Sequence, residues 1–305
     1  MIRSHATVTP LRALLFSLAA TFSLLASSVR AQAEVDTINA VASFSILADM
    51  VEVVGGDHVT VTSIVGPDSD AHVYIPSVGD ARAVAAADII FVNGLGFEGW
   101  ISDLVVAAEA SAPVIVATQA ITPLIVEGEP DPHAWNALDN AKLYAAGIAS
   151  GLSVLAPDRA EAFADNAAAF SAKVDALLAD ASARFSALPE GRRTVVTGHD
   201  AFGYFEAQFG LRFLAPLGVN TEAEPSAREL AALIRQIRDE EVVGLFVENI
   251  TNPDLVNQIA DETGLEVGGR LYSDALSVRG GPATTYLTMM NHNISALLQA
   301  LEPSN

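Results

Sequence analysis

The sequence predicts an α/β protein with two βα lobes, each built on a mainly parallel sheet, and one long rigid helix that joins them. Two sets of short, β-rich apolar runs alternate with helical stretches, which is the pattern of βα units in parallel sheets. A long stretch with helical periodicity separates the two sets. About 270 residues remain after a predicted leader, which is more than one hydrophobic core usually serves.

The leader is a predicted secretory signal assigned to residues 1–33. Arg3 and Arg12 give a basic start, an apolar stretch follows, and small residues precede a predicted cleavage after Ala31 or Ala33. The apolar stretch is shorter than the roughly 20 residues that a membrane-spanning helix needs. We therefore expect an exported, soluble protein.

Two lobes are assigned to residues 34–156 and 190–305. Each contains four short apolar runs with helical stretches between them, so each should form one mainly parallel sheet. In the first lobe the runs are 39–44, 59–65, 88–93 and 113–118. In the second lobe they are 194–197, 211–214, 244–247 and 266–272.

The linking helix is assigned to residues 157–189, with helical periodicity over 158–188. Asp158 and Glu161 predict a capping pair at its start, and Pro189 ends it. At ~1.5 Å per residue the helix would be roughly 45 Å long, enough to run along both lobes and limit hinge opening. Its apolar residues are spaced by threes and fours: Phe163, Ala167, Phe170, Val174, Leu177, Ala181, Phe185 and Leu188.

Composition limits both the partners and the metal chemistry. The 16 basic and 37 acidic residues give a formal net charge of −21, and loss of the three leader arginines lowers it to −24. This charge disfavours nucleic acid and suits cations, although much of it serves as an ordinary solubilising coat. The chain has no cysteine, so any metal must be held by nitrogen and oxygen. Because cysteine would also carry a lipid after cleavage, we expect a free, monomeric periplasmic protein with no lipid anchor.

Four residues share a position relative to the predicted strands. His72, His199 and Asp274 each follow a strand, and His133 precedes a helix. Ligands of open α/β sheets bind in the crevice outside the carboxyl ends of the strands. With two candidates in each lobe, one interdomain cleft could gather all four residues.

Three neutral imidazoles and a carboxylate suit zinc, which takes nitrogen and oxygen ligands in a tetrahedron. Manganese would favour more carboxylate. A shell of four protein ligands leaves no open position, which favours capture of the ion over activation of water. From spacing alone, scattered loop histidines are the alternative. His58 and His292 are expected at the surface, and His5 lies in the leader.

The segments around these residues resemble successive signatures of one family, the cluster A-I (cluster 9) metal-binding proteins of ABC importers. The resemblance covers essentially the whole chain after the leader. A histidine at the third ligand position resembles the zinc branch, and the pattern is similar to the AztC-type zinc proteins. It departs from the ZnuA type because 121–130 is short and acidic rather than histidine-rich. The matching segments are 70–76, 93–100, 131–135, 199–205, 246–249, 259–264 and 271–276.

This resemblance implies a periplasmic receptor, not an enzyme, that carries one Zn²⁺ per chain. It implies the ligands His72, His133, His199 and Asp274, one at each metal position of the family's motifs. The implied partner is an ABC permease in the inner membrane, and zinc would arrive free or from a periplasmic metallochaperone.

Acids beside the site are expected to orient a ligand imidazole or to screen the cation, and Asp200 and Glu248 are the candidates. Four aromatic residues are expected to wall the site, with ordinary packing between the lobes as the alternative: Tyr74, Trp135, Phe202 and Tyr204.

Three other functions compete with zinc transport. Residues 94–99 match G-x-G-x-x-G after a strand, but the acidic partner of a dinucleotide site is missing. A zinc hydrolase would use Glu248 or Asp200 as its base, yet neither H-E-x-x-H nor G-x-S-x-G occurs. A manganese receptor on the same fold is the third alternative.

Overall fold

Eight strands of the described residues form two four-stranded sheets. The computed structural model describes residues 1–2, 37–240 and 242–303. The strands of the N-terminal sheet are β1 (Ile38–Phe44), β2 (Val59–Val65), β3 (Ile89–Val92) and β4 (Val114–Val116). Those of the C-terminal sheet are β7 (Thr194–Val196), β8 (Arg212–Leu214), β9 (Gly244–Glu248) and β10 (Val267–Leu271). The bounds of each strand lie within two residues of a predicted run.

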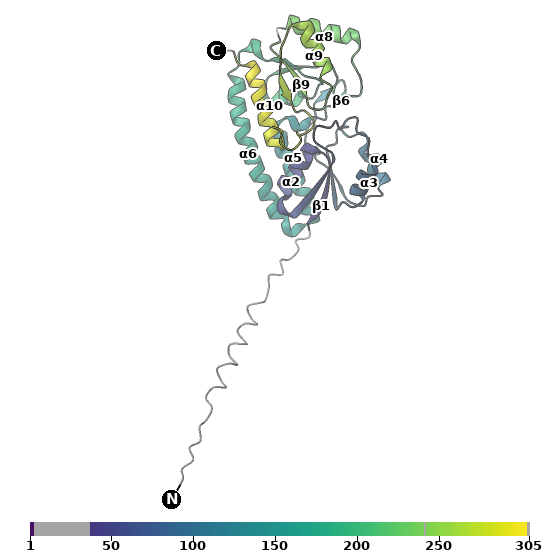
Figure 1. The fold of residues 1–305 in the computed structure, drawn as a ribbon, viewed down its shortest axis with the longest axis vertical. Coiled ribbons are helices and arrows are strands. Elements are labelled where there is room, and N and C mark those ends of the chain that lie inside the picture. The colour runs from purple at the N-terminus through teal and green to yellow at the C-terminus, as the bar shows by residue number, and fades with distance from the viewer. Residues whose placement is uncertain (3–36, 241, 304–305) are drawn as a thin grey trace. The chain divides into compact units, whose positions relative to one another are not determined.

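The two sheets have corresponding topologies. Their strand orders are β2-β1-β3-β4 and β10-β9-β7-β8, and every pairing within them is parallel. Parallel strands buried on both faces are apolar along their length, as β3 is. A small antiparallel hairpin of β5 (Ile125–Val126) and β6 (Glu129–Pro130) follows the first sheet. The predicted α/β fold with two mainly parallel lobes is confirmed (Figure 1).

Helices connect successive strands in both lobes. Three helices, α3 (Val78–Ala85), α8 (Ala227–Asp239) and α10 (Tyr286–Leu301), begin with a capping box that satisfies free N–H groups of the first turn. The helices of the first lobe are α2 (Ser45–Gly55), α3 (Val78–Ala85), α4 (Ile101–Ala107) and α5 (Leu138–Leu155). Those of the second lobe are α7 (Gly203–Phe209), α8 (Ala227–Asp239), α9 (Asp254–Thr263) and α10 (Tyr286–Leu301). Short 3-10 turns are η1 (Gly56–His58), η2 (Ala134–Asn136), η3 (Pro157–Arg159) and η4 (Glu190–Arg192).

The long helix α6 (Ala160–Ser186) lies between the lobes in sequence and runs beside elements of both (Figure 1). The predicted cap by Asp158 and Glu161 is wrong, because η3 leads into the helix and no side chain caps its first turn. The predicted apolar stripe does face the interior. Its buried members are Phe163, Ala167, Phe170, Val174, Ala181, Phe185 and, just after the helix, Leu188.

One hydrophobic core extends through both lobes along α6. The helix packs on α2 and α5 of the first lobe. The ring of Phe170 lies 5.9 Å from that of Tyr286 in α10, and the ring of Phe185 lies 5.7 Å from that of Phe205 in α7. A second, smaller core lies under α8 and α9. The apolar stripe of α6 therefore serves both lobes at once.

Buried hydrogen bonds also join the lobes. The indole Nε1 of Trp135 donates to the carbonyl of Ser273 at 2.7 Å, and the Tyr286 hydroxyl donates to the carbonyl of Trp135 at 2.9 Å. The backbone N–H of Leu276 donates to the Ser45 hydroxyl at 3.0 Å. These bonds hold the loop that carries Asp274 against the loop that carries His133.

The predicted signal lies outside the described residues, except for Met1 and Ile2. In the part of the chain that the structure describes, none of the helices has the length and apolar character needed to cross a membrane.

Candidate metal centre

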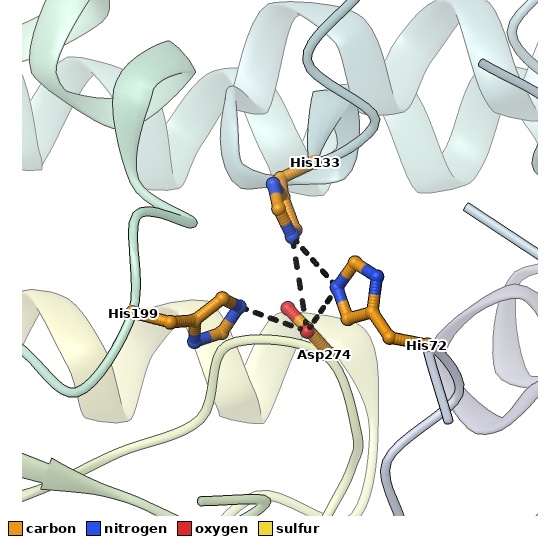
Figure 2. A group of neighbouring side chains, drawn as sticks. All are labelled: His72, His133, His199 and Asp274. Carbon is orange, nitrogen blue, oxygen red and sulfur yellow. Dashed lines mark hydrogen bonds and ion pairs between the residues drawn. The ribbon is translucent and has the colours of Figure 1, made fainter. Parts of the chain in front are cut away.

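The four predicted ligands meet in one buried place, which we call the His/Asp cluster: His72, His133, His199 and Asp274. Each offers one ligand atom, and these atoms all lie within 4.8 Å of one another. Figure 2 shows the three imidazoles directed at the carboxylate. Because the residues come from both lobes, the predicted position between the lobes agrees with the structure.

The carboxylate Oδ2 of Asp274 is the centre of the cluster. It lies 3.3 Å from Nε2 of His72, 3.1 Å from Nε2 of His199 and 3.8 Å from Nε2 of His133. The Nε2 atoms of His72 and His133 are 3.2 Å apart. Such close approach of four polar atoms suits a shared cation better than direct hydrogen bonding among all of them.

The parallel sheets explain why these residues converge. His72 follows β2, His133 follows β4 and the β5–β6 hairpin, His199 follows β7, and Asp274 follows β10. The carboxyl ends of parallel strands lie at the same edge of a sheet. The two sheets turn these edges toward one another, so residues that follow the strands face a common space.

A buried carboxylate orients each of two imidazoles. Oδ1 of Asp131 lies 2.8 Å from Nδ1 of His133, and Oε2 of Glu248 lies 2.6 Å from Nδ1 of His199. Such an acceptor at Nδ1 directs Nε2 at the ion and makes it a stronger ligand. Glu248 therefore has the orienting role expected for it, whereas Asp131 was not anticipated in this role.

The other residues expected beside the site differ in how they contact the ligand imidazoles. Among the described residues, no hydrogen bond or ion pair joins the Asp200 side chain to a ligand imidazole, so the screening alternative is the one that remains for it. Burial raises the pKa of Asp200, and the nearby His133 and His199 oppose that rise. Trp135 is fully buried beside His133, with ring centroids 5.4 Å apart. The Tyr204 hydroxyl donates to the carbonyl of Asp131 at 2.8 Å and so supports the residue that orients His133.

Two further aromatic residues lie near the cluster only indirectly. Tyr74 packs on Trp100 with ring centroids 5.3 Å apart. Phe202 stacks on Phe213 within the second lobe. Tyr74 and Phe202 are therefore packing residues, which is the alternative that the sequence left open for them.

The electrostatics of the cluster favour an ion pair between an ionised Asp274 and a protonated His199. Burial would raise the pKa of Asp274, but His199 and His133 outweigh it and hold that pKa well below its usual range. Burial would lower the pKa of His199, but Glu248 and Asp274 hold it well above the usual 6.5. A proton on His199 thus balances buried negative charge, and a cation could take its place.

The remaining described histidines lie outside the cluster. His58 is half-buried with its ring 6.0 Å from that of Phe163, so its predicted exposure is wrong. His292 is also half-buried, and its Nε2 lies 2.9 Å from the carbonyl oxygen of Arg270.

The glycine-rich segment 94–99 binds a carboxylate of its own chain. Glu98 is buried and accepts hydrogen bonds from the backbone N–H groups of Asn93 and Gly94 and from the Ser43 hydroxyl. Burial raises the pKa of Glu98. Gly94 has φ +84°, and an added Cβ would lie 2.6 Å from Val116. The glycine therefore allows close packing on β4, and Glu98 occupies N–H groups that a phosphate would need.

Three relatives match most of the chain. The manganese-binding lipoprotein MntA of Halalkalibacterium halodurans is 30% identical over 86% of this chain and 87% of its own length. The protein of the same name from Bacillus subtilis is 32% identical over 86% and 89%. The iron ABC transporter substrate-binding lipoprotein MtsA of Streptococcus pyogenes is 29% identical over 88% and 90%.

Solved structures show the same fold. The periplasmic zinc-binding protein TroA from Treponema pallidum matches with a TM-score of 0.84, at 28% identity over 88% of this chain and 100% of that one. A point mutant of a periplasmic metal-binding protein from Candidatus Liberibacter asiaticus, solved with manganese bound, matches with a TM-score of 0.82, at 30% identity over 87% and 100%.

The predicted absence of a lipid anchor is contradicted by the relatives, because all three are named lipoproteins. That prediction depended only on the lack of cysteine in the printed sequence, which does not outweigh the names of proteins that match over most of their length.

A family model described as the periplasmic zinc-uptake complex component A, ZnuA, matches residues 40–300. This match includes both sheets and all four residues of the His/Asp cluster. The chain therefore belongs to the ZnuA family of periplasmic metal-binding receptors of ABC transporters, which are solute-binding proteins and not enzymes.

Proposed function

We propose that this receptor binds one Zn²⁺ at His72, His133, His199 and Asp274 and delivers it to an ABC permease in the inner membrane. The observation that carries the proposal is the composition of the His/Asp cluster. It contains three imidazoles and one carboxylate, whose ligand atoms all lie within 4.8 Å of one another. Zinc accepts this mixture of nitrogen and oxygen.

The distances within the cluster support a tetrahedral ion. Bonds of ~2.0–2.1 Å in a tetrahedron separate the ligand atoms by roughly 3.3–3.4 Å. Four of the six separations are 3.1, 3.2, 3.3 and 3.8 Å, and all six are within 4.8 Å. A small shift of His133 would bring its separation of 3.8 Å from Asp274 into this range.

The surroundings of the cluster support a doubly charged cargo. Asp131, Glu248 and Asp274 are buried there together, and no Lys or Arg forms an ion pair with them among the described residues. A divalent cation offsets two of these three negative charges, and carboxylates at Nδ1 strengthen imidazole ligands.

Manganese is the second candidate. Two relatives are named manganese-binding, and one matching structure holds manganese. The Asp274 Oδ1 atom is buried without a hydrogen-bond partner among the described residues, so this carboxylate could bind an ion through both oxygens. A second carboxylate oxygen would suit the higher coordination of manganese.

Metal analysis of the purified protein tests the assignment. We expect zinc at one ion per chain after exposure to equal zinc and manganese, and loss of that zinc in His133→Ala. His292→Ala is the matched control, because His292 lies outside the cluster, and it should keep full zinc content. Manganese in place of zinc would support the second candidate, and the absence of both would refute a metal site here.

Other parts of the proposal follow the family. We propose that the receptor acts as a monomer and that zinc arrives free or from a periplasmic metallochaperone. We also propose that the chain divides into two lobes, residues 34–156 and 190–305, joined by the linking segment 157–189. Analytical ultracentrifugation with and without zinc would test the monomer.

A further inference from the structure

His72 is held differently from the other two imidazoles. Nδ1 of His133 and Nδ1 of His199 each face a buried carboxylate, at 2.8 and 2.6 Å. Among the residues that the structure describes, no hydrogen bond or ion pair reaches Nδ1 of His72. Its ring packs edge-on against Phe97, with centroids 4.8 Å apart, which is an apolar contact.

The His72 side chain is also the most accessible part of the cluster. His72 is 9% exposed, whereas the other three residues are 0% exposed. A cavity of about 220 Å³ reaches it, with Gly96, Glu129, Pro132 and Asn220 in its wall. This volume accommodates several water molecules at ~30 Å³ each. Four other cavities described in the chain are larger, but no residue of the His/Asp cluster lines any of these four.

The chain around His72 differs from that around the other ligands. His72 lies in an irregular segment between β2 and α3, and its neighbours Val73 and Ile75 are 49% and 86% exposed. His133 lies beside the fully buried Trp135. His199 forms an isolated parallel β-bridge with Leu217. The surroundings of His72 therefore leave its ring the most room to rotate.

From these differences we propose that His72 is the exchange ligand of the site. The ion enters through the cavity at His72, contacts His133, His199 and Asp274 first, and binds His72 last; on release, His72 detaches first. Rotation of His133 or His199 would break the contact of its Nδ1 with a buried carboxylate, which is costly, whereas rotation of His72 breaks no hydrogen bond at Nδ1. This inference rests on the proposed metal-binding function.

Zinc exchange kinetics test the order of binding. Stopped-flow mixing of the full protein with zinc, and of the zinc-loaded protein with excess fluorescent chelator, gives the two rate constants. In His72→Ala we expect dissociation to be at least about tenfold faster and association to stay within about twofold of the wild type. In His133→Ala we expect association itself to fall. Circular dichroism melting of both variants checks that they fold.

Two outcomes overturn the inference. One is a His72→Ala protein in which association slows as much as dissociation accelerates, and the other is equal loss of zinc in the two variants. If the wild-type protein binds no zinc, the proposed function fails instead, so the two failures are distinct.

A matched pair of acids tests the route. Glu129 and Glu127 are both exposed residues of the β5–β6 hairpin, but only Glu129 lines the cavity at His72; Glu127 lines another cavity with Asp200. Glu129→Gln should slow zinc association about two- to fivefold at low salt, with less effect at high salt. Glu127→Gln should have less than half of that effect. Equal effects of the two variants would refute this route.

Discussion

Asp49 connects the packing of two helices to the pH dependence of stability. Its carboxylate Oδ2 accepts a hydrogen bond of 2.8 Å from the backbone N–H of Tyr286, the first residue of α10. Burial raises the pKa of Asp49 from 3.8 to about 6, against the opposing effect of that hydrogen bond. A carboxyl group with a higher pKa in the folded state binds more protons when folded. The charged form is therefore unfavourable at neutral pH, and this cost disappears as the pH falls toward 3.8.

The magnitude follows from the shift in pKa. A shift of one unit corresponds to ~1.36 kcal/mol, so the full shift would cost about 3 kcal/mol above pH 7. The side chain is only partly buried, so solvent screening reduces this cost to about 1–2 kcal/mol. At pH 5 roughly half of the cost should remain.

The substitution Asp49→Asn removes the charge and keeps an oxygen that can accept from Tyr286. We expect the variant to be more stable than the wild type by about 1–2 kcal/mol at pH 7.5, with a smaller difference at pH 5 and almost none at pH 4. Urea denaturation of both proteins at the three pH values measures this. A variant that is less stable at pH 7.5, or a difference that does not change with pH, would refute the reasoning.

Three other predictions concern the cluster and the core. Glu248→Gln should weaken zinc binding about 10- to 100-fold in a chelator competition, because the Nδ1 of His199 loses a charged acceptor; unchanged affinity would contradict this role. Zinc affinity should fall as the pH is lowered from about 8 to about 5, and the fall should begin above 6.5, because the pKa of His199 is raised and its proton competes with the ion. A flat profile would count against His199 as a ligand. Phe170→Ala should lower the free energy of unfolding by about 3–5 kcal/mol, since a fully buried ring is removed, and calorimetry would show the loss.

The strands and the ligand positions were predictable because both depend on local patterns. Short apolar runs bounded by turns mark each strand, and a residue just after a parallel strand lies at its carboxyl end whatever the rest of the chain does. The resemblance to a known family then indicated which polar residues at those ends belong together. Convergence itself needed the structure, since order along the chain does not bring two lobes into contact.

The orienting carboxylates were harder to predict. Asp70 and Asp131 each precede a ligand histidine by two residues, and each accepts from that histidine's backbone N–H, at 2.8 and 2.9 Å. Only Asp131 also contacts the ring Nδ1. The second oxygen of Asp70 accepts instead from the hydroxyl of Thr221 in the other lobe. The same spacing has two outcomes because a distant residue competes for the carboxylate, and sequence alone does not place that residue.

Because the apolar stripe of α6 serves both lobes, neither lobe should be stable as a separate fragment. Phe163 and Phe170 cover the first lobe and α10, and Phe185 covers α7, so either half expressed alone would present bare aromatic rings to water. Such fragments would aggregate rather than refold as miniature receptors. For the same reason the intact molecule should melt in a single cooperative transition, and a metal bound between the lobes would protect amide protons along the whole helix.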